Sequence, residues 1–360
     1  MKVLHVLRQL NPGGIECWLE RLVRLWPTQS RPEFHFALED PDFGILAPEF
    51  VSHGVKLHYC PPPKNIGNSV RGFLSILKHS GPFAAVHCHN HHASAFHLLL
   101  AAESHVPLRI SQSHADFSAD LDQRFPLRRW YRKSASLALQ SLANVKLAVS
   151  GGAAKDLFGE HVRGLSIFPC GTDFESLFAV ECRPDPARFT LVHVGRLVSG
   201  KNHKFLFQIM VELTQRQPNA RLWLIGDGPL RASLEQEAAR LGIAESVHFW
   251  GNRSDVPSLL AAANLFVFPS FSEGLGLAAI EAQAAGLPVL LAAHLPAELD
   301  LLPGRCKRLA LDLPIGKWVD SILEMKEIPS LQLAERKSFL THSRFSMDSN
   351  IRILSQIYAC

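Results

Sequence analysis

Short apolar runs alternate with helix-like segments along almost the whole chain, and this alternation limits the fold more than any other feature of the sequence. Strands of a parallel sheet covered by helices on both faces are buried, and they read as short apolar runs. Apolar residues spaced about three or four apart, as in 15–25, mark the helices between them. In the first half we predict strands at 3–7, 34–38, 56–59, 84–88, 108–111, 146–150 and 166–168, and in the second half at 191–194, 221–225, 247–249, 265–268 and 289–291.

The pattern stops and restarts near the middle of the chain. Residues 170–189 contain two prolines and no clear periodicity, so we interpret them as a linker. A chain of 360 residues is also too long for one ordinary core. We therefore predict an α/β protein with two Rossmann-like, doubly wound domains that face a central cleft, one over 1–175 and one over 185–345. The pattern leaves open which of them the last helix, near 345–360, packs against.

Composition excludes several classes of protein. With 47% hydrophobic and 19% charged residues, the chain is globular rather than disordered. It has no uncharged apolar run of about 20 residues, so we expect no membrane span, and the apolar part of its first residues is too short for a signal peptide. The seven cysteines include no C-x-x-C pair, and a net charge of +4 is too small to indicate a nucleic-acid partner. We expect a cytoplasmic protein.

One segment, RFPLRRWYRK at 124–133, is strongly basic. Arg124, Arg128 and Arg132 recur every four positions, so they share one face of a helix. Beside this basic stripe lie Arg129, Trp130, Tyr131 and Lys133. The stripe is either a solvated helix face or a surface for an acidic acceptor or the anionic inner face of the membrane, which the protein would then contact peripherally.

Two carboxylates stand in an otherwise apolar or small run, PSFSEGLGLAAIEAQAAGLP at 269–288. The glycines after the preceding strand predict a turn into a helix, whose free backbone N–H groups suit a phosphate or sugar hydroxyls. Glu273 lies in that turn and is expected to face the cleft. Glu281 lies about two helical turns further on, where a carboxylate can accept two hydrogen bonds from the vicinal diol of a ribose. The alternative is that one glutamate caps the helix and the other is exposed on it.

A second loop carries two cations. In LVHVGRLVSGKNH, Arg196 and Lys201 follow the first strand of the second half, and they suit a diphosphate whose negative charge grows as it departs. The chain contains neither G-x-G-x-x-G nor G-x-x-x-x-G-K-[ST], so neither motif supports a nucleotide site here. LIGDGP, at 224–229, predicts a third strand-to-helix turn. Each loop alone is weak evidence, because arginine and lysine are common on surfaces.

Taken together, these loops resemble a known family. GR…KN, IGDGP, VHFWGNRSDV and PSFSEGLGLAAIEAQAAGLPVL, in this order and spacing, are similar to the retaining glycosyltransferases of family 4, which have the GT-B fold. The first half agrees in NPGGIE, VHCHNHHAS, RISQSHADFS, AVSGGAAKDLFG and FPCGTD, which look like the branch active in capsular and exopolysaccharide assembly. The resemblance covers roughly residues 1–300.

The resemblance implies a nucleotide-sugar donor site in the second domain. Arg196 and Lys201 would bind the donor diphosphate, and Glu281 would bind the ribose. Glu273 is the expected catalytic carboxylate of that site. It would hold the donor sugar together with the backbone of Gly274, Leu275 and Gly276.

In the first, acceptor-side domain the resemblance implies three further contacts. Gly13 and Gly14 would bring backbone N–H groups against the phosphate. His114 matches the family's active-site histidine near the anomeric carbon, although a structural histidine is the alternative. The family's frequent N-G-[IV]-D reads Cys170-Gly171-Thr172-Asp173 here, which leaves Asp173 as a candidate cleft residue.

A histidine tract follows the fourth predicted strand. Metal binding, contact with an acceptor in the cleft, and packing are its three possible roles. No carboxylate or cysteine cluster completes a metal site, so we predict none and keep His89 and His91 as candidate acceptor contacts. The tract consists of His87, His89, His91 and His92.

The function predicted from these residues is a retaining sugar transfer from a nucleotide-diphosphate sugar, UDP- or GDP-linked, to a sugar, lipid-linked or other hydroxyl acceptor in polysaccharide or glycolipid assembly. We expect no cofactor and no metal, because the second half contains no D-x-D sequence. A nucleotide-sugar epimerase of the same fold and a non-catalytic nucleotide-sugar-binding module are the alternatives.

Overall fold

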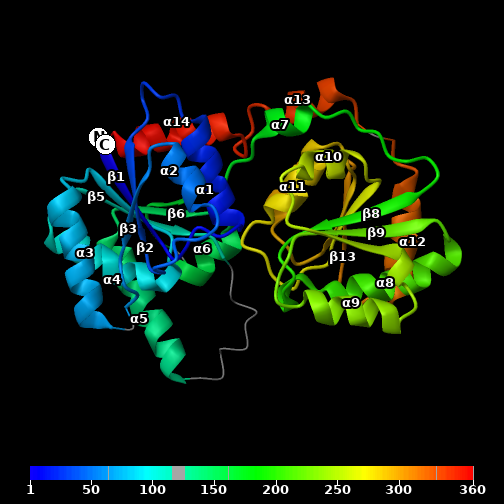
Figure 1. The fold of residues 1–360 in the computed structure, drawn as a ribbon, viewed down its shortest axis with the longest axis horizontal. Coiled ribbons are helices and arrows are strands. Elements are labelled where there is room, and N and C mark those ends of the chain that lie inside the picture. Colours follow the sequence, from blue (N-terminus) through cyan, green and yellow to red (C-terminus); the bar gives the residue numbers. More distant parts are fainter. Residues whose placement is uncertain (64, 116–125, 161, 330, 360) are drawn as a thin grey trace. The chain divides into compact units, whose positions relative to one another are not determined.

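The computed structural model of the protein describes residues 1–63, 65–115, 126–160, 162–329 and 331–359. They form two α/β units (Figure 1). The first unit comprises Met1–Gly171 and Met347–Cys360, and the second comprises Thr172–Ser346. The chain therefore returns to the first unit with its last helix.

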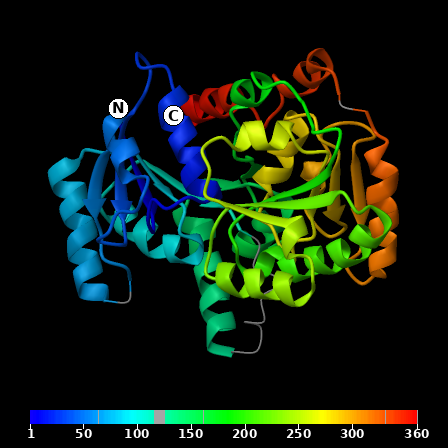
Figure 2. The same ribbon diagram turned by 45° about the vertical axis from the view of Figure 1, so that its right-hand side comes forward.

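The first unit is built on a parallel sheet with strand order β3-β2-β1-β4-β5-β6-β7. The central strands consist almost entirely of buried residues, because helices lie on both faces of the sheet (Figure 2). The strands are β1 (Lys2–Leu7), β2 (Glu33–Leu38), β3 (Lys56–Tyr59), β4 (Ala85–Cys88), β5 (Leu108–Ser113), β6 (Val145–Ala148) and β7 (Leu165–Ile167).

The helices of the first unit contribute their apolar faces to its core. Val6, Phe73, Leu98 and Leu157 belong to one buried cluster. The helices are α1 (Gly14–Leu25), α2 (Ala47–Ser52), α3 (Ile66–Ser80), α4 (Ser94–Glu103), α5 (Pro126–Leu142), α6 (Gly151–Phe158) and α14 (Met347–Tyr358), with a 3-10 turn at His91–Ala93.

The last helix, α14, packs against α1 of the first unit. Asn350 Oδ1 accepts hydrogen bonds from Trp18 Nε1, at 2.9 Å, and from the backbone N–H of Gly171, at 2.8 Å. A Cβ at Gly171 would lie 2.8 Å from Met347 Sδ and 3.0 Å from Asn350 Cγ, so any larger residue would have to displace side chains of α14. This resolves the question that the sequence left open about the last helix.

The second unit is built on a parallel sheet with strand order β10-β9-β8-β11-β12-β13. Its strands are β8 (Phe189–Val194), β9 (Ala220–Ile225), β10 (Val247–Gly251), β11 (Leu265–Phe268), β12 (Val289–Ala292) and β13 (Cys306–Leu309). Its helices are α7 (Phe174–Phe178), α8 (His203–Arg216), α9 (Arg231–Arg240), α10 (Val256–Ala261), α11 (Leu277–Ala284), α12 (Ile315–Lys326) and α13 (Leu333–Leu340), with 3-10 turns at Ser199–Lys201, Ala244–Ser246 and Ala297–Leu299.

Both sheets therefore reverse their strand order once. The reversal lies between β1 and β4 in the first unit and between β8 and β11 in the second. In open α/β sheets ligands bind beyond the carboxyl ends of the strands at this point. The predicted fold class, two Rossmann-like doubly wound domains, is confirmed.

Two elements differ from the sequence expectations. β13 was not predicted, because its residues, Cys-Lys-Arg-Leu, are all partly exposed at the sheet edge and show no apolar run. The predicted linker 170–189 contains the short helix α7, which packs against α11. Among the described helices, none is both long and apolar enough to span a membrane.

Candidate active site

Two loops of the second unit meet beyond the strands where its sheet reverses. One follows β8 and leads through Gly195–Asn202 into α8, and the other follows β11 and leads into α11. The backbone N–H of Phe271 donates to the carbonyl of Gly200, at 2.8 Å, and Asn202 Nδ2 donates to the carbonyl of Pro269, at 3.1 Å. These bonds hold the two predicted donor loops together.

The same loops join Lys201 to Glu273. Lys201 Nζ donates to Glu273 Oε1 at 2.6 Å, and the side chains are only 20% and 10% exposed. The ammonium group also lies 5.1 Å from the centre of the Phe268 ring. The sequence predicted separate partners for these two residues, a diphosphate and a sugar, and did not predict that they bind each other.

Arg196 lies on the first of these loops and is exposed. Within the described ranges its guanidinium has no hydrogen bond or ion pair to the protein. Its five N–H donors are therefore open to a ligand, and this planar fork suits phosphate oxygens.

The glycine turn before α11 has a steric cause. Gly276 is in the left-handed region, with φ of +93°, and a Cβ there would lie 3.2 Å from Leu299 and from Phe268. Leu275 is buried, whereas Gly274 is partly exposed. Glu281 lies on α11 and is partly exposed too, so the structure does not bury it as a core residue.

The carboxyl end of α11 is held by two buried arginines that the sequence analysis missed. Arg336 Nη1 donates to the carbonyl of Ala284, at 2.7 Å, and Arg305 Nη2 donates to that of Gly286, at 2.9 Å. Cations are favourable at a helix carboxyl end, where the last carbonyls lack partners within the helix. Both lie in the tail beyond residue 300, which carries no recognisable motif.

The third predicted loop, after β9, packs closely against the backbone of the loop after β8. Gly226 has φ of +127°, and a Cβ there would lie 2.3 Å from the carbonyl oxygen of Gly195. A Cβ on Gly228 would lie 2.6 Å from the carbonyl oxygen of Leu197. These glycines let the loop approach the backbone on either side of Arg196.

In the first unit, Gly13 and Gly14 open helix α1 directly beyond β1. Gly13 has an extended backbone, which any residue adopts, but a Cβ there would lie 2.5 Å from Glu16 Oε2. A larger residue at this position would therefore require the Glu16 side chain to move.

His114 lies just beyond β5 and is enclosed by polar and aromatic neighbours. Its Nε2 is 2.9 Å from His89 Nδ1, and its Nδ1 is 3.5 Å from Cys170 Sγ. The Trp18 ring lies 5.7 Å away between centres. Burial, with smaller contributions from His87 and His91, lowers the pKa of His114 to about 3. The ring is therefore neutral near pH 7 and does not carry a proton to donate as an imidazolium.

The structure separates the other candidates. His91 Nε2 lies 3.1 Å from Asp156 Oδ2, in a different network from that of His89. Asp173 belongs to the second unit, where it accepts a hydrogen bond from the backbone N–H of Ser176, at 3.3 Å, at the start of α7. A capping role accounts for Asp173 in the structure.

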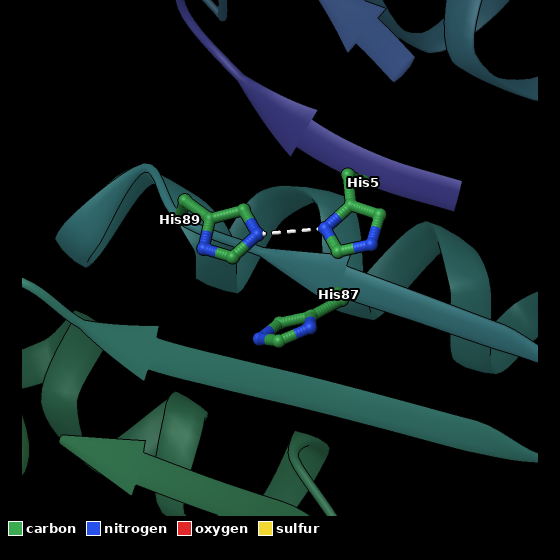
Figure 3. A group of neighbouring side chains, drawn as sticks. All are labelled: His5, His87 and His89. Carbon is green, nitrogen blue, oxygen red and sulfur yellow. Dashed lines mark hydrogen bonds between the residues drawn. The ribbon is translucent and has the colours of Figure 1, made fainter. Parts of the chain in front are cut away.

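Three imidazoles of the first unit, those of His5, His87 and His89, present ring nitrogens within 4.8 Å of one another (Figure 3). His5 Nδ1 and His89 Nε2 are 2.9 Å apart and their ring planes differ by 2°. Two ligands of a tetrahedral zinc ion, each bonded at about 2.0–2.1 Å, would lie about 3.3 Å apart, so the pair fits a hydrogen bond better. His5 and His87 are register partners on β1 and β4, a signal that the sequence analysis did not use.

The basic stripe needs a correction. Arg132 is not on the exposed face, because it bonds to Asp156, a carboxylate whose side chain is 4% exposed and needs a cation. Arg124 lies outside the described residues. Within the basic segment, the residues of α5 that are exposed are Arg128, Arg129, Trp130, Tyr131 and Lys133.

The buried histidines predict sensitivity to acid. Burial lowers the pKa of His87, His92 and His114 to about 3, below the unfolded value near 6.5. The unfolded chain then binds more protons between these values, so stability is full above pH 6.5 and is lost as the pH falls. The free energy of unfolding, measured with a denaturant, should be lower at pH 5 than at pH 7 by about 1–2 kcal/mol for each such histidine. An equal free energy of unfolding at both pH values would contradict this. Between pH 7 and pH 5, the free energy of unfolding should fall less for His114→Asn than for the wild type.

Comparison with known proteins agrees with this architecture. Residues 181–300 match the family model of glycosyl transferases group 1. The chain is 30% identical over 376 residues to a Bacillus subtilis protein named as a glycosyltransferase, EpsF, covering 99% of this chain and 96% of EpsF. It is 38% identical over 105 residues to a GDP-mannose-dependent phosphatidylinositol dimannoside mannosyltransferase of Mycobacterium tuberculosis, covering 29% of this chain and 27% of that protein.

Among solved structures, Anabaena HepE in complex with UDP superposes with a TM-score of 0.80 at 17% identity, covering 100% of both chains. This likeness concerns the fold. The match to EpsF over nearly the full length of both chains, together with the family match over residues 181–300, shows the family. The protein belongs to the group 1 glycosyltransferases.

Proposed function

We propose that the protein is a retaining glycosyltransferase of family 4 that moves a sugar from a nucleotide-diphosphate sugar to a hydroxyl acceptor in exopolysaccharide or related glycolipid assembly. The observation that carries this is the pair of joined loops beyond β8 and β11, which place Arg196, the Lys201–Glu273 pair and a glycine turn at the reversal of the second sheet. The name EpsF supports the polysaccharide context.

The proposed donor is UDP- or GDP-linked. HepE is described with UDP and with UDP-glucose, and the mycobacterial relative is described as GDP-mannose-dependent. Arg196 and Lys201 are proposed to bind the diphosphate, and Glu281 the ribose. Lys201 Nζ has three N–H donors, of which one is directed to Glu273, so a phosphate oxygen can be bound without breaking that pair.

The proposed reaction breaks the bond between the anomeric carbon and the diphosphate oxygen and forms one to the acceptor hydroxyl oxygen on the same face. The acceptor proton passes to the departing phosphate, and Arg196 and Lys201 stabilise the negative charge left there. Glu273, with the backbone of Gly274, Leu275 and Gly276, is proposed to hold the sugar. From the first unit, Gly13, Gly14 and His114 are proposed to contribute to donor binding and to the reaction centre.

A screen of nucleotide sugars by thermal shift tests the donor, because a ligand that binds the native state raises the apparent melting temperature. The donor found is then incubated without acceptor. A new sugar isomer under those conditions would indicate the epimerase instead, and binding without turnover on any acceptor would indicate the non-catalytic module.

We expect the exposed residues of the basic segment on α5, from Arg128 to Lys133, to bind anionic membranes, where a lipid-linked acceptor would be found. The full chain should sediment with anionic liposomes at low salt, and salt should release it, because screening weakens the attraction of cations to the surface. Arg128→Glu combined with Arg129→Glu should reduce binding, whereas Arg71→Glu combined with Lys78→Glu, the same charge change on α3, should not. Binding that ignores salt, or no binding, would contradict the proposal.

A further inference from the structure

A series of hydrogen bonds crosses the core of the first unit from His87 through His114 to Cys170. It joins residues from β1, β4, the segment beyond β5, the region of Cys170, and α14. Figure 3 shows one of its central links, between His5 and His89. The links are Cys170 Sγ to His114 Nδ1 (3.5 Å), His114 Nε2 to His89 Nδ1 (2.9 Å), His89 Nε2 to His5 Nδ1 (2.9 Å), His5 Nε2 to Tyr358 Oη (3.4 Å) and Tyr358 Oη to His87 Nδ1 (2.9 Å).

The members of this hydrogen-bond series are uncharged near pH 7, and all are buried except His114, which is partly exposed. His5 and His87 are fully buried, and Tyr358 is 3% exposed. Burial lowers the pKa of each histidine in the chain well below its ordinary value and raises that of Tyr358. A neutral imidazole has one N–H and one bare nitrogen. Each ring that accepts at one nitrogen must therefore donate at the other, so the direction of one link decides the direction of all.

The geometry at Tyr358 decides that direction. Its oxygen is 2.9 Å from His87 Nδ1 and 3.4 Å from His5 Nε2. A phenol O–H is a more acidic donor than an imidazole N–H, and O–H bonds are the shorter class, so the hydroxyl proton belongs to the His87 link. Tyr358 then accepts from His5 Nε2–H, His5 Nδ1 accepts from His89, and His89 Nδ1 accepts from His114.

The two ends of the hydrogen-bond series differ in how they fit this direction. His87 must carry its proton on Nε2, which is buried and has no hydrogen-bond partner among the described residues, although the Gln112 side chain raises the pKa of His87 against the larger effect of burial. At the other end, burial raises the pKa of Cys170, so its thiol keeps the S–H that the bare Nδ1 of His114 accepts.

We propose that Tyr358, His5 and His89 are positioning residues that hold His114 as the Nε2–H tautomer and keep its Nδ1 as a hydrogen-bond acceptor for a sugar hydroxyl. A thiol is a weak donor, so a substrate hydroxyl can replace Cys170 at Nδ1 without disturbing the strong links behind the ring. The assignment of the tautomer depends only on the hydrogen bonds described here, whereas the binding of a sugar hydroxyl rests on the proposed function.

Nitrogen-15 NMR of the histidine side chains in the full chain tests the tautomer directly, with resonances assigned by single-histidine variants. Wild-type His114 should be protonated at Nε2. Tyr358→Phe removes the acceptor of His5 Nε2–H, and since a buried N–H without a partner is unfavourable, the chain should reverse and move the His114 proton to Nδ1. Tyr59→Phe is the matched control, and the separate His35–His58 pair, at 2.9 Å, should be unchanged in every variant.

Wild-type His114 protonated at Nδ1, or a folded Tyr358→Phe variant in which the His114 tautomer does not change, would overturn the proposal. Bound zinc at one ion per protein molecule, together with nitrogen-15 shifts typical of metal ligands for His5, His87 and His89, would also overturn it. If Tyr358→Phe does not fold, the wild-type spectrum still decides.

Kinetics supply a second measurement that a purely structural role would not change in the same way. Tyr358→Phe should lower kcat about tenfold and leave the donor KM within about twofold, because the chain acts on the orientation of His114 rather than on the donor loops. An unchanged kcat despite the reversed tautomer would overturn the role toward a hydroxyl. If the wild type transfers no sugar at all, the proposed function fails while the spectra still test the tautomer.

Discussion

Replacing Lys201 with alanine is expected to lower kcat/KM for the preferred nucleotide sugar about a hundredfold, near 3 kcal/mol of transition-state stabilisation. The substitution removes a cation from the proposed diphosphate site and also leaves Glu273, only 10% exposed, without its 2.6 Å partner. An unpaired carboxylate there would repel the phosphate as negative charge develops on it. The loss of kcat/KM should therefore exceed that of Arg196→Ala, because within the described ranges Arg196 has no protein partner that its removal would leave unpaired.

Lys204→Ala is the matched control for this substitution. Lys204 is exposed in the first turn of α8, three residues beyond Lys201, and should be neutral to turnover. Steady-state kinetics with the donor from the thermal-shift screen give the comparison. A Lys201→Ala enzyme within about threefold of the wild type would show that the diphosphate is bound elsewhere.

The second large effect concerns the two glutamates. Glu281→Gln should weaken the binding of the bare nucleoside diphosphate about tenfold, because an amide supplies one acceptor oxygen where a carboxylate supplies two, and loses the charge that strengthens such bonds. Glu273→Gln should leave that binding unchanged or slightly tighter, since it releases Lys201 to the phosphate, while transfer falls by about tenfold or more.

Calorimetry with the nucleoside diphosphate and with the intact donor, on both variants, separates these roles. Both substitutions keep the shape of the side chain, so each serves as the steric control of the other. Equal losses of bare nucleotide in the two variants would refute the assignment of Glu281 to the ribose and Glu273 to the sugar.

Most strands could be predicted because their residues are buried on both faces. The runs around Val3–Leu7 and Leu265–Phe268 are examples, and the structure places β1 and β11 there. β13 escaped prediction because an edge strand with half-exposed lysine and arginine has no such run. The loops after β8 and β11, which carry the proposed donor residues, could be located because turn chemistry and cation spacing are local properties of the sequence.

The remaining features depend on tertiary contacts that local pattern does not contain. Tyr358 forms a hydrogen bond with His87, 271 positions away in the sequence. It lies on α14, and the sequence did not indicate which unit that helix packs against. Helical spacing put Arg132 in the basic stripe, but the buried Asp156 on α6 binds it. The Lys201–Glu273 pair likewise requires that two loops, 72 residues apart, be joined at the reversal of the sheet.

The most direct test of the account is the titration of UDP and GDP into the wild-type protein and into Arg196→Ala. The account predicts that one of the two binds the wild type with one-to-one stoichiometry, and that Arg196→Ala weakens it at least about tenfold without lowering the melting temperature of the free protein. Equal affinity in both proteins, or no binding of either nucleotide to the wild type, would contradict the claim that the loops beyond β8 and β11 hold the donor diphosphate.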